Sequence, residues 1–164
     1  MMEQSVVLLL GSNDYEAEAL VSKAIDIIGL SVGRVERISR SFRSEAYGFT
    51  SDREFVNRAI EIRTALDAYE VLRRINLIEA LLGRDREEEC RVKAERAEAY
   101  ASRPIDIDII FYGDMTFNDS RLTIPYHFLD EREYALRPVA DIAGERKHPQ
   151  LKMTPRQMLE ALKK

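Results

Sequence analysis

The 164-residue sequence contains no tryptophan and a single cysteine, Cys90. One cysteine excludes an internal disulfide framework and is typical of a reducing compartment. Long hydrophobic runs are missing as well: the apolar run at 6–10 is too short to cross a bilayer, and no basic segment precedes it as in a signal peptide. We therefore expect a cytoplasmic protein with no membrane partner.

The composition has no extreme charge or hydrophobicity. Hydrophobic residues make up 45% of the chain, charged residues 33%, and the formal net charge is −4. These values fit an ordinary globular protein, and the length fits one domain over 1–164. An acidic balance gives no general attraction to nucleic acid. We expect a single-domain monomer without a nucleic-acid partner.

Hydrophobic periodicity predicts an alternation of strands and helices. The predicted strands are 5–10, 33–42, 54–63 and 103–112, and the predicted helices are 16–28, ended by Gly29, and 67–83, capped by Asp67. Beyond them we expect a turn at 113–114, an extended piece at 122–125, a helix at 131–143 broken at Pro138, and a last helix opened by Thr154-Pro155.

This order of elements predicts an α+β, ferredoxin-like βαββαβ sandwich. Such a fold has an antiparallel sheet with helices on one face, here followed by C-terminal additions, and its other face is free to carry a site. The segment 84–102 is nearly all charged or alanine, which indicates a mobile loop or an exposed helix.

The strand at 103–112 alternates strictly between apolar and acidic side chains. Ile105, Ile107 and Ile109 fall on one face, and Asp106 and Asp108 share the other. Two neighbouring carboxylates repel each other in a strand, so the pattern favours a bound divalent cation between them. The pattern alone also fits a solvated sheet face with two incidental aspartates.

Other candidate groups bracket this strand. Guanidinium groups clamp phosphates well, and Arg84, Arg103, Arg121 and Arg132 are the candidates, although each also fits a solvated surface charge. Asn57 carries a carboxamide that can pair with the edge of a heterocycle. P-loop, dinucleotide and nucleophile motifs are all absent from the sequence, so covalent catalysis by the protein is unsupported.

Aromatic side chains and one histidine complete the set. Tyr47, Phe49, Phe55 and Tyr134 are able to sandwich a planar ring, or to belong to the core. His127 is a ligand or a base, or a packing residue beside its apolar neighbours.

Several segments, in order and over nearly the whole chain, resemble the hydroxymethyl-dihydropterin pyrophosphokinase family. The family transfers the β,γ-diphosphate of ATP to the hydroxymethyl group of a reduced pterin, gives AMP, and supplies folate biosynthesis. The segments are Leu9-Leu10-Gly11-Ser12-Asn13, Phe55-Val56-Asn57, Gly83-Arg84, Arg103-Pro104-Ile105-Asp106-Ile107-Asp108 and Leu122-Thr123-Ile124-Pro125 followed by Arg132.

The resemblance implies ATP as co-substrate, a reduced hydroxymethyl pterin as substrate, and two Mg²⁺ ions held by Asp106 and Asp108. It also implies that Asp108 accepts the substrate hydroxyl proton and that Arg84 and Arg103 bind the phosphates. The residues implied to bind the pterin are Ser44, Tyr47, Phe55, Asn57 and Tyr134. Those implied to bind the nucleotide are Asn76, Glu79, Tyr100, Ile109, Arg121, Thr123, His127 and Arg132.

The chain departs from the family pattern at three places. The segment between Arg84 and Arg103, expected to close over ATP as a lid, is longer than usual and carries Tyr100 in place of a tryptophan. The usual Ile-Pro-His is Ile-Pro-Tyr126-His127, so either His127 replaces the family histidine or its function is lost. The loop after Ser44 lacks its usual proline.

Three alternatives differ from this enzyme. A ferredoxin-like binding module would use the two aspartates for a structural cation and release no AMP. A single-strand nucleic-acid binder would need basic residues where Asp52 and Glu54 stand. A relative that binds without turnover would fit the altered Tyr126-His127 segment.

Overall fold

The computed structural model describes residues 2–44, 54–84 and 104–163. Its main sheet is antiparallel, with the strand order β2-β4-β1-β5 and with β3 paired to β4. The strands are β1 (Gln4–Ser12), β2 (Arg34–Ile38), β3 (Phe42–Ser44), β4 (Phe55–Thr64) and β5 (Asp106–Tyr112), and β6 (Phe117–Asn118) and β7 (Thr123–Ile124) form a small second sheet.

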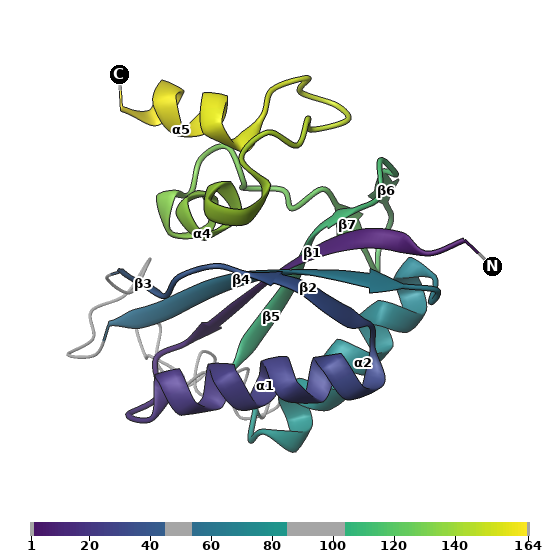
Figure 1. Cartoon of the computed structure of the whole chain (residues 1–164), viewed down its shortest axis with the longest axis vertical. Helices are drawn as coiled ribbons and strands as arrows, with labels where there is room; N and C mark the ends of the chain where they lie inside the picture. Colours follow the sequence, from purple (N-terminus) through teal and green to yellow (C-terminus); the bar gives the residue numbers. More distant parts are fainter. Residues whose placement is uncertain (1, 45–53, 85–103, 164) are drawn as a thin grey trace.

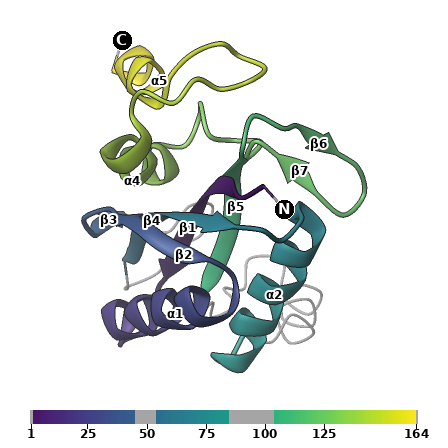
Figure 2. The same ribbon diagram turned by 45° about the vertical axis from the view of Figure 1, so that its right-hand side comes forward.

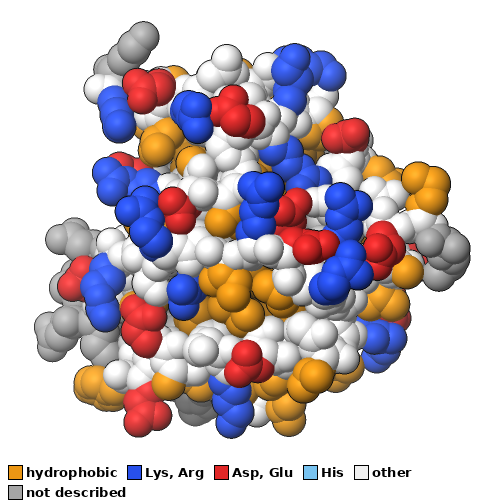
Figure 3. Space-filling view, in the orientation of Figure 1, with side chains coloured by type: hydrophobic (Ala, Val, Ile, Leu, Met, Phe, Trp, Pro, Cys, Tyr) orange, Lys and Arg blue, Asp and Glu red, His pale blue; other side chains and the backbone are white. Residues whose placement is uncertain are grey.

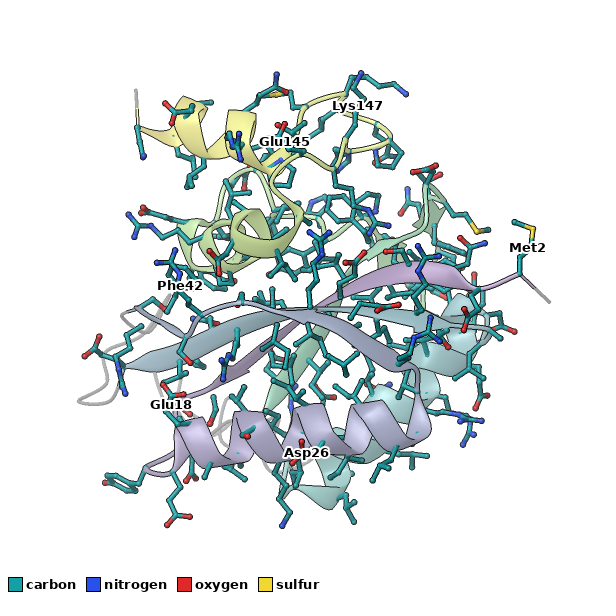
Figure 4. All side chains as sticks on the ribbon, in the orientation of Figure 1. Met2, Glu18, Asp26, Phe42, Glu145 and Lys147 are labelled. Carbon is teal, nitrogen blue, oxygen red and sulfur yellow. The ribbon has the colours of Figure 1, made fainter. Side chains whose placement is uncertain are left out.

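Helices cover both faces of the main sheet. Helices α1 (Ala17–Ser31) and α2 (Ala68–Leu81) lie on one face, and α4 (Glu133–Ala143) with α5 (Pro155–Leu162) lies on the other (Figures 1 and 2). Figure 4 shows the same division, with Asp26 on α1 and Glu145 after α4 on opposite sides of the sheet. The two helices of the predicted βαββαβ unit lie on one face as expected, but the other face is not free, because the C-terminal additions supply a second helical layer there.

The sequence of β1 explains why two layers are needed. Its central residues are apolar without alternation, so both faces of the strand must be buried. Val6, Leu8 and Leu10 belong to the core under α1 and α2, and Val7 and Leu9 belong to the core under α4. The second core is completed by α4 and α5 residues: Ala135, Leu136, Val139 and Met158.

The predicted alternation in β5 is confirmed. Ile107 and Ile109 are buried in the core beneath α1 and α2. Asp106 and Asp108 face the α4 side, opposite Gly11 and Leu9 of β1. The two carboxylates therefore lie on the face that the C-terminal helices partly cover.

The predicted strand at 33–42 is two strands. Ser39 lies between β2 and β3, and its hydroxyl accepts a hydrogen bond from the Ala59 backbone N–H at 2.9 Å, in place of a backbone carbonyl. This side-chain substitution interrupts the ladder. The strand therefore restarts at Phe42.

Two helix boundaries also differ from expectation. Helix α1 continues through Gly29 to Ser31. Helix α4 continues through Pro138, although proline cannot donate to the preceding turn. Burial of Ala135, Leu136, Pro138 and Val139 against the sheet offsets that lost bond. The Thr154-Pro155 start of α5 is confirmed, with a full capping box to Gln157.

Charge on the visible surface is mixed. Figure 3 shows basic and acidic side chains interleaved over this face. Among the described residues, oppositely charged side chains form ion pairs, such as Arg40 with Asp141 at 3.1 Å and Arg37 with Glu61 at 3.4 Å. Within the described residues, helices are too short or too polar to cross a membrane.

Candidate active site

Asp106 lies in a cluster of charged side chains at the start of β5. The Arg84 guanidinium donates to Asp106 Oδ1 at 2.6 Å and to Glu79 Oε2 at 2.9 Å. The side chains of Glu79 and Arg84 are only 1% and 6% exposed, and that of Asp106 is 30% exposed. Arg84 is thus held in the protein by two carboxylates.

The end of α2 explains how Arg84 reaches this position. Gly83 has a φ of 103°, which favours glycine. The Arg84 N–H donates to Glu79 O at 3.0 Å and the Gly83 N–H donates to Ala80 O at 3.2 Å, which is a Schellman motif. The motif folds Arg84 back onto Glu79.

Glu79 also holds the edge of β5. Its Oε2 accepts a hydrogen bond from the Ile107 backbone N–H at 2.8 Å. Because β5 is an outer strand of the main sheet, this amide would otherwise be a buried donor without a strand partner. One carboxylate therefore fixes both Arg84 and the strand that carries the two aspartates.

Asp108 lies two residues further along the same face. Burial raises the pKa of Asp108 well above its usual range, and the negative charges of Asp106 and Glu79 raise the pKa further. Arg84 opposes this shift. Among the described residues that shift this pKa, the three carboxylates carry more negative charge than Arg84 compensates.

This excess of negative charge fits a bound cation. Mg²⁺ is usually held by one or two carboxylates together with substrate phosphates. Among the residues described, groups of three or more potential metal ligands are absent. Asp106 and Asp108 fit the carboxylate part of such a site.

A cavity of about 470 Å³ opens between β3, β4 and the start of α4. It brings together four of the predicted residues, which come from three separate parts of the sequence: Ser44, Asn57, Arg132 and Tyr134. Asn57 is 3% exposed and donates from Nδ2 to Ser44 Oγ at 3.1 Å. A buried carboxamide in the wall of a cavity is suited to reading the polar edge of a ring.

Gly11 lies between this cavity and the aspartates, although the predicted strand 5–10 ended before it. In the ladder, Gly11 pairs with Asn57 on one side and with Asp106 on the other. A Cβ at this position would lie 2.9 Å from Asn57 Oδ1. Because glycine has no side chain, space remains between Asn57 and Asp106, whose strands lie two strand spacings, about 10 Å, apart.

Tyr126 is a second residue whose place sequence reasoning left open. Its hydroxyl lies 3.1 Å from the Tyr134 hydroxyl. Burial raises the pKa of Tyr126, and the Tyr134 hydrogen bond and the charge of Asp108 add to this effect. His127 is exposed, and its ring packs edge-on against Phe128 with centroids 4.7 Å apart.

The remaining predicted residues lie at varied distances from this centre. Phe55 begins β4 and pairs with Ser44, whereas Ile109 is a core residue and Asn76 is exposed on α2. Arg121 and Thr123 belong to the β6–β7 hairpin region, where the Arg121 guanidinium lies 5.0 Å from the centre of the Tyr69 ring. The predicted residues Tyr47, Tyr100 and Arg103, and the predicted lid, lie outside the described part of the chain.

Known proteins resemble this chain over most of its length. The family model described as 7,8-dihydro-6-hydroxymethylpterin-pyrophosphokinase (HPPK) matches residues 7–144. The chain is 32% identical over 139 residues to a 2-amino-4-hydroxy-6-hydroxymethyldihydropteridine pyrophosphokinase of Porphyromonas gingivalis, covering 84% of this chain and 90% of that protein. It is 34% identical over 137 residues to the enzyme of that name from Methylorubrum extorquens, covering 83% of this chain and 80% of that protein.

The fold has solved relatives too. A crystal structure of Plasmodium falciparum HPPK-DHPS superposes with a TM-score of 0.76 at 16% sequence identity, covering 98% of this chain. This chain spans only 43% of that solved chain. From the sequence match and the shared fold, the chain belongs to the 7,8-dihydro-6-hydroxymethylpterin-pyrophosphokinase family.

Proposed function

We propose that this protein transfers the β,γ-diphosphate of ATP to the hydroxymethyl group of 6-hydroxymethyl-7,8-dihydropterin, giving the pterin diphosphate and AMP for folate biosynthesis. Family membership supports the reaction. The observation that carries it in this chain is the row Asn57-Gly11-Asp106 across three neighbouring strands. The row puts the Asn57 carboxamide, proposed for ring recognition, and the Asp106 carboxylate, proposed for phosphate chemistry, on one face with Gly11 between them.

Asp106 and Asp108 are the residues that would hold two Mg²⁺ ions. When bound, the metal neutralises charge on the phosphates and orients them. Arg84 is the described guanidinium nearest to this place, and it suits the phosphate oxygens because it is planar and permanently charged. Arg103 is proposed for the same role.

The pterin would occupy the cavity beside α4. Asn57 offers a buried carboxamide to the ring edge, and Ser44 holds the Asn57 amide nitrogen. Tyr134 in the cavity wall, with Phe55 and Tyr47, is proposed to stack on the ring. In this proposed pose the hydroxymethyl group would point toward β5.

The chemical step is an in-line displacement at the β-phosphorus. The substrate hydroxyl oxygen forms a bond to that phosphorus, the bond to the oxygen bridging the α- and β-phosphates breaks, and AMP leaves with that oxygen. Asp108 is proposed to accept the hydroxyl proton on its carboxylate.

Several broader features are also proposed. The strand order β2-β4-β1-β5 with α1 and α2 on one face supports a ferredoxin-like type of sheet. We propose one pyrophosphokinase domain over the chain, acting as a cytoplasmic monomer on ATP and the pterin, with no nucleic-acid partner. Asn76, Glu79, Tyr100, Ile109, Arg121, Thr123, His127 and Arg132 stay candidates for the nucleotide side, directly or through neighbours.

The test is AMP release from ATP, Mg²⁺ and the hydroxymethyl pterin. We expect AMP only when all three are present, and a loss of turnover of about 10²-fold or more in Asp106→Asn and Asp108→Asn with an unchanged circular dichroism spectrum. Asp26→Asn is the matched control, because Asp26 is exposed on α1 across the sheet. Binding of ATP without pterin-dependent AMP release would instead indicate a binding module, and near-normal turnover in Asp108→Asn would remove Asp108 from the chemistry.

A further inference from the structure

A pair of phenols lies between β5 and the substrate cavity. Tyr134 lies in the cavity wall together with Asn57 and Arg132. Its hydroxyl lies 3.1 Å from that of Tyr126, which belongs to a different segment, between β7 and α4. The two rings therefore meet between β5 and the cavity.

The backbone fixes Tyr126 in this place. Its N–H donates to Ile110 O at 3.0 Å, which attaches the segment to the outer edge of β5 two residues beyond Asp108. Its carbonyl accepts from the Leu129 N–H at 3.2 Å. The side chain packs against the core beneath α4, so its hydroxyl is a fixed point rather than a mobile surface group.

The next residue, His127, has different surroundings from Tyr126. His127 is exposed and contacts Phe128. Among its described contacts, bonds to the aspartates or to the cavity residues are absent. The structure therefore distinguishes the two residues, and Tyr126 is the one whose side chain contacts a residue of the cavity wall.

We propose that Tyr126 is a positioning residue that orients Tyr134 in the wall of the pterin cavity. This inference rests on the proposed function, because it concerns how the pterin is held. A phenolic ring attached at both its Cβ and its hydroxyl has fewer orientations than a ring attached at Cβ alone. Tyr126 thereby lowers the entropy that Tyr134 loses when it stacks on a substrate ring.

The expected effect is on pterin affinity. One hydrogen bond of this kind corresponds to about a 2- to 10-fold change in an equilibrium constant. Tyr126→Phe keeps the ring and its packing but removes the hydroxyl. We expect the KM for the pterin to rise by about that factor, with kcat and the KM for ATP within about twofold of wild type.

The decisive experiment is a double-mutant cycle with Tyr126→Phe, Tyr134→Phe and the double variant. Pterin dissociation constants are measured by fluorescence titration with Mg²⁺ and a non-hydrolysable ATP analogue present. Each single variant is expected to weaken pterin binding by a similar factor, and the double variant is expected to be no weaker than either, since both remove the same bond. A purely structural role would instead lower stability without this coupling in pterin binding.

Tyr112→Phe is the matched control. Tyr112 also donates one internal phenolic hydrogen bond, to Leu66 O, but it lies in the opposite core beneath α2. Additive effects in the cycle, or unchanged pterin affinity in a folded Tyr126→Phe variant, would overturn the positioning role while leaving the reaction intact. Absence of pterin binding and AMP release in the wild-type protein would overturn the proposed function itself.

Discussion

Glu79 offers the sharpest test of how the site is built. Its carboxylate is 1% exposed, accepts the Ile107 N–H at 2.8 Å and pairs with the Arg84 guanidinium at 2.9 Å. Replacing Glu79 by alanine removes the hydrogen bond to the Ile107 N–H and the ion pair with Arg84 at once. Replacing it by glutamine keeps an oxygen for Ile107 but removes the charge.

The two variants should therefore differ in stability. Removing one member of a buried ion pair lowers the free energy of unfolding by about 3–5 kcal/mol. We expect about half of that loss here, because Arg84 keeps its other ion pair, with Asp106. A buried N–H left without an acceptor adds about 1–3 kcal/mol. We expect the free energy of unfolding to fall by about 3–5 kcal/mol in Glu79→Ala, and by about 1–2 kcal/mol in Glu79→Gln because only the charge is lost.

Urea unfolding followed by far-ultraviolet circular dichroism measures the free energy of unfolding of both variants. With a slope of about 2 kcal/mol per molar urea, Glu79→Ala should lower the midpoint by about 2 M. Glu133→Gln, which breaks the exposed pair with Arg137, is the matched control and should cost less than about 1 kcal/mol. Glu79→Ala within 1 kcal/mol of wild type, or Glu79→Gln as damaging as Glu79→Ala, would refute the assignment of a double role.

Three further predictions concern other parts of the molecule. Gly11→Ala should raise the KM for the pterin about tenfold with little change for ATP, because the new Cβ would lie 2.9 Å from Asn57 Oδ1; an unchanged KM would contradict the spacing argument. The raised pKa of Asp108 means that protons compete with Mg²⁺ up to higher pH than at an ordinary aspartate, so half-saturating Mg²⁺ in AMP release should rise as the pH falls, and a flat dependence would count against Asp108 as a ligand. Burial lowers the pKa of His148 below its ordinary 6.5, and the neutral Nδ1 accepts hydrogen bonds from the Gln150 and Leu151 N–H groups. Because the folded protein favours neutral His148, the stability present above pH 6.5 is lost as the pH falls below that value. His148→Gln should therefore reduce the change in melting temperature between pH 7.5 and pH 5.5.

Local patterns predicted the elements that carry the site. Alternation along β5 correctly placed Asp106 and Asp108 on one face, because strand geometry alone decides which side chains share a face. The Asp67 cap of α2 and the Thr154 capping box also depend only on neighbouring residues, and both are present. Such features need no knowledge of the rest of the chain.

Features that depend on distant contacts were missed. The predicted strand 5–10 stops short of Gly11 and Ser12, yet both belong to β1, and the need for glycine comes from the Asn57 side chain on the next strand. Asn76 and Glu79 are neighbours on α2, but only Glu79 reaches β5, because the packing of the helix against the sheet separates the two. No local pattern reports which residue of Tyr126-His127 faces the site.

The charge balance of the cluster connects stability with function. Asp106, Asp108 and Glu79 are three carboxylates, and Arg84 is the one cation that the described contacts place among them. Such an excess of one sign in a partly buried place costs folding free energy. The proposed Mg²⁺ would be held by Asp106 and Asp108 and would supply positive charge that offsets this excess. Arg84, which contacts Asp106 Oδ1, is the described cation placed to bind nucleotide phosphates in that proposed site. On this reasoning the cluster gives up stability in order to hold a cation.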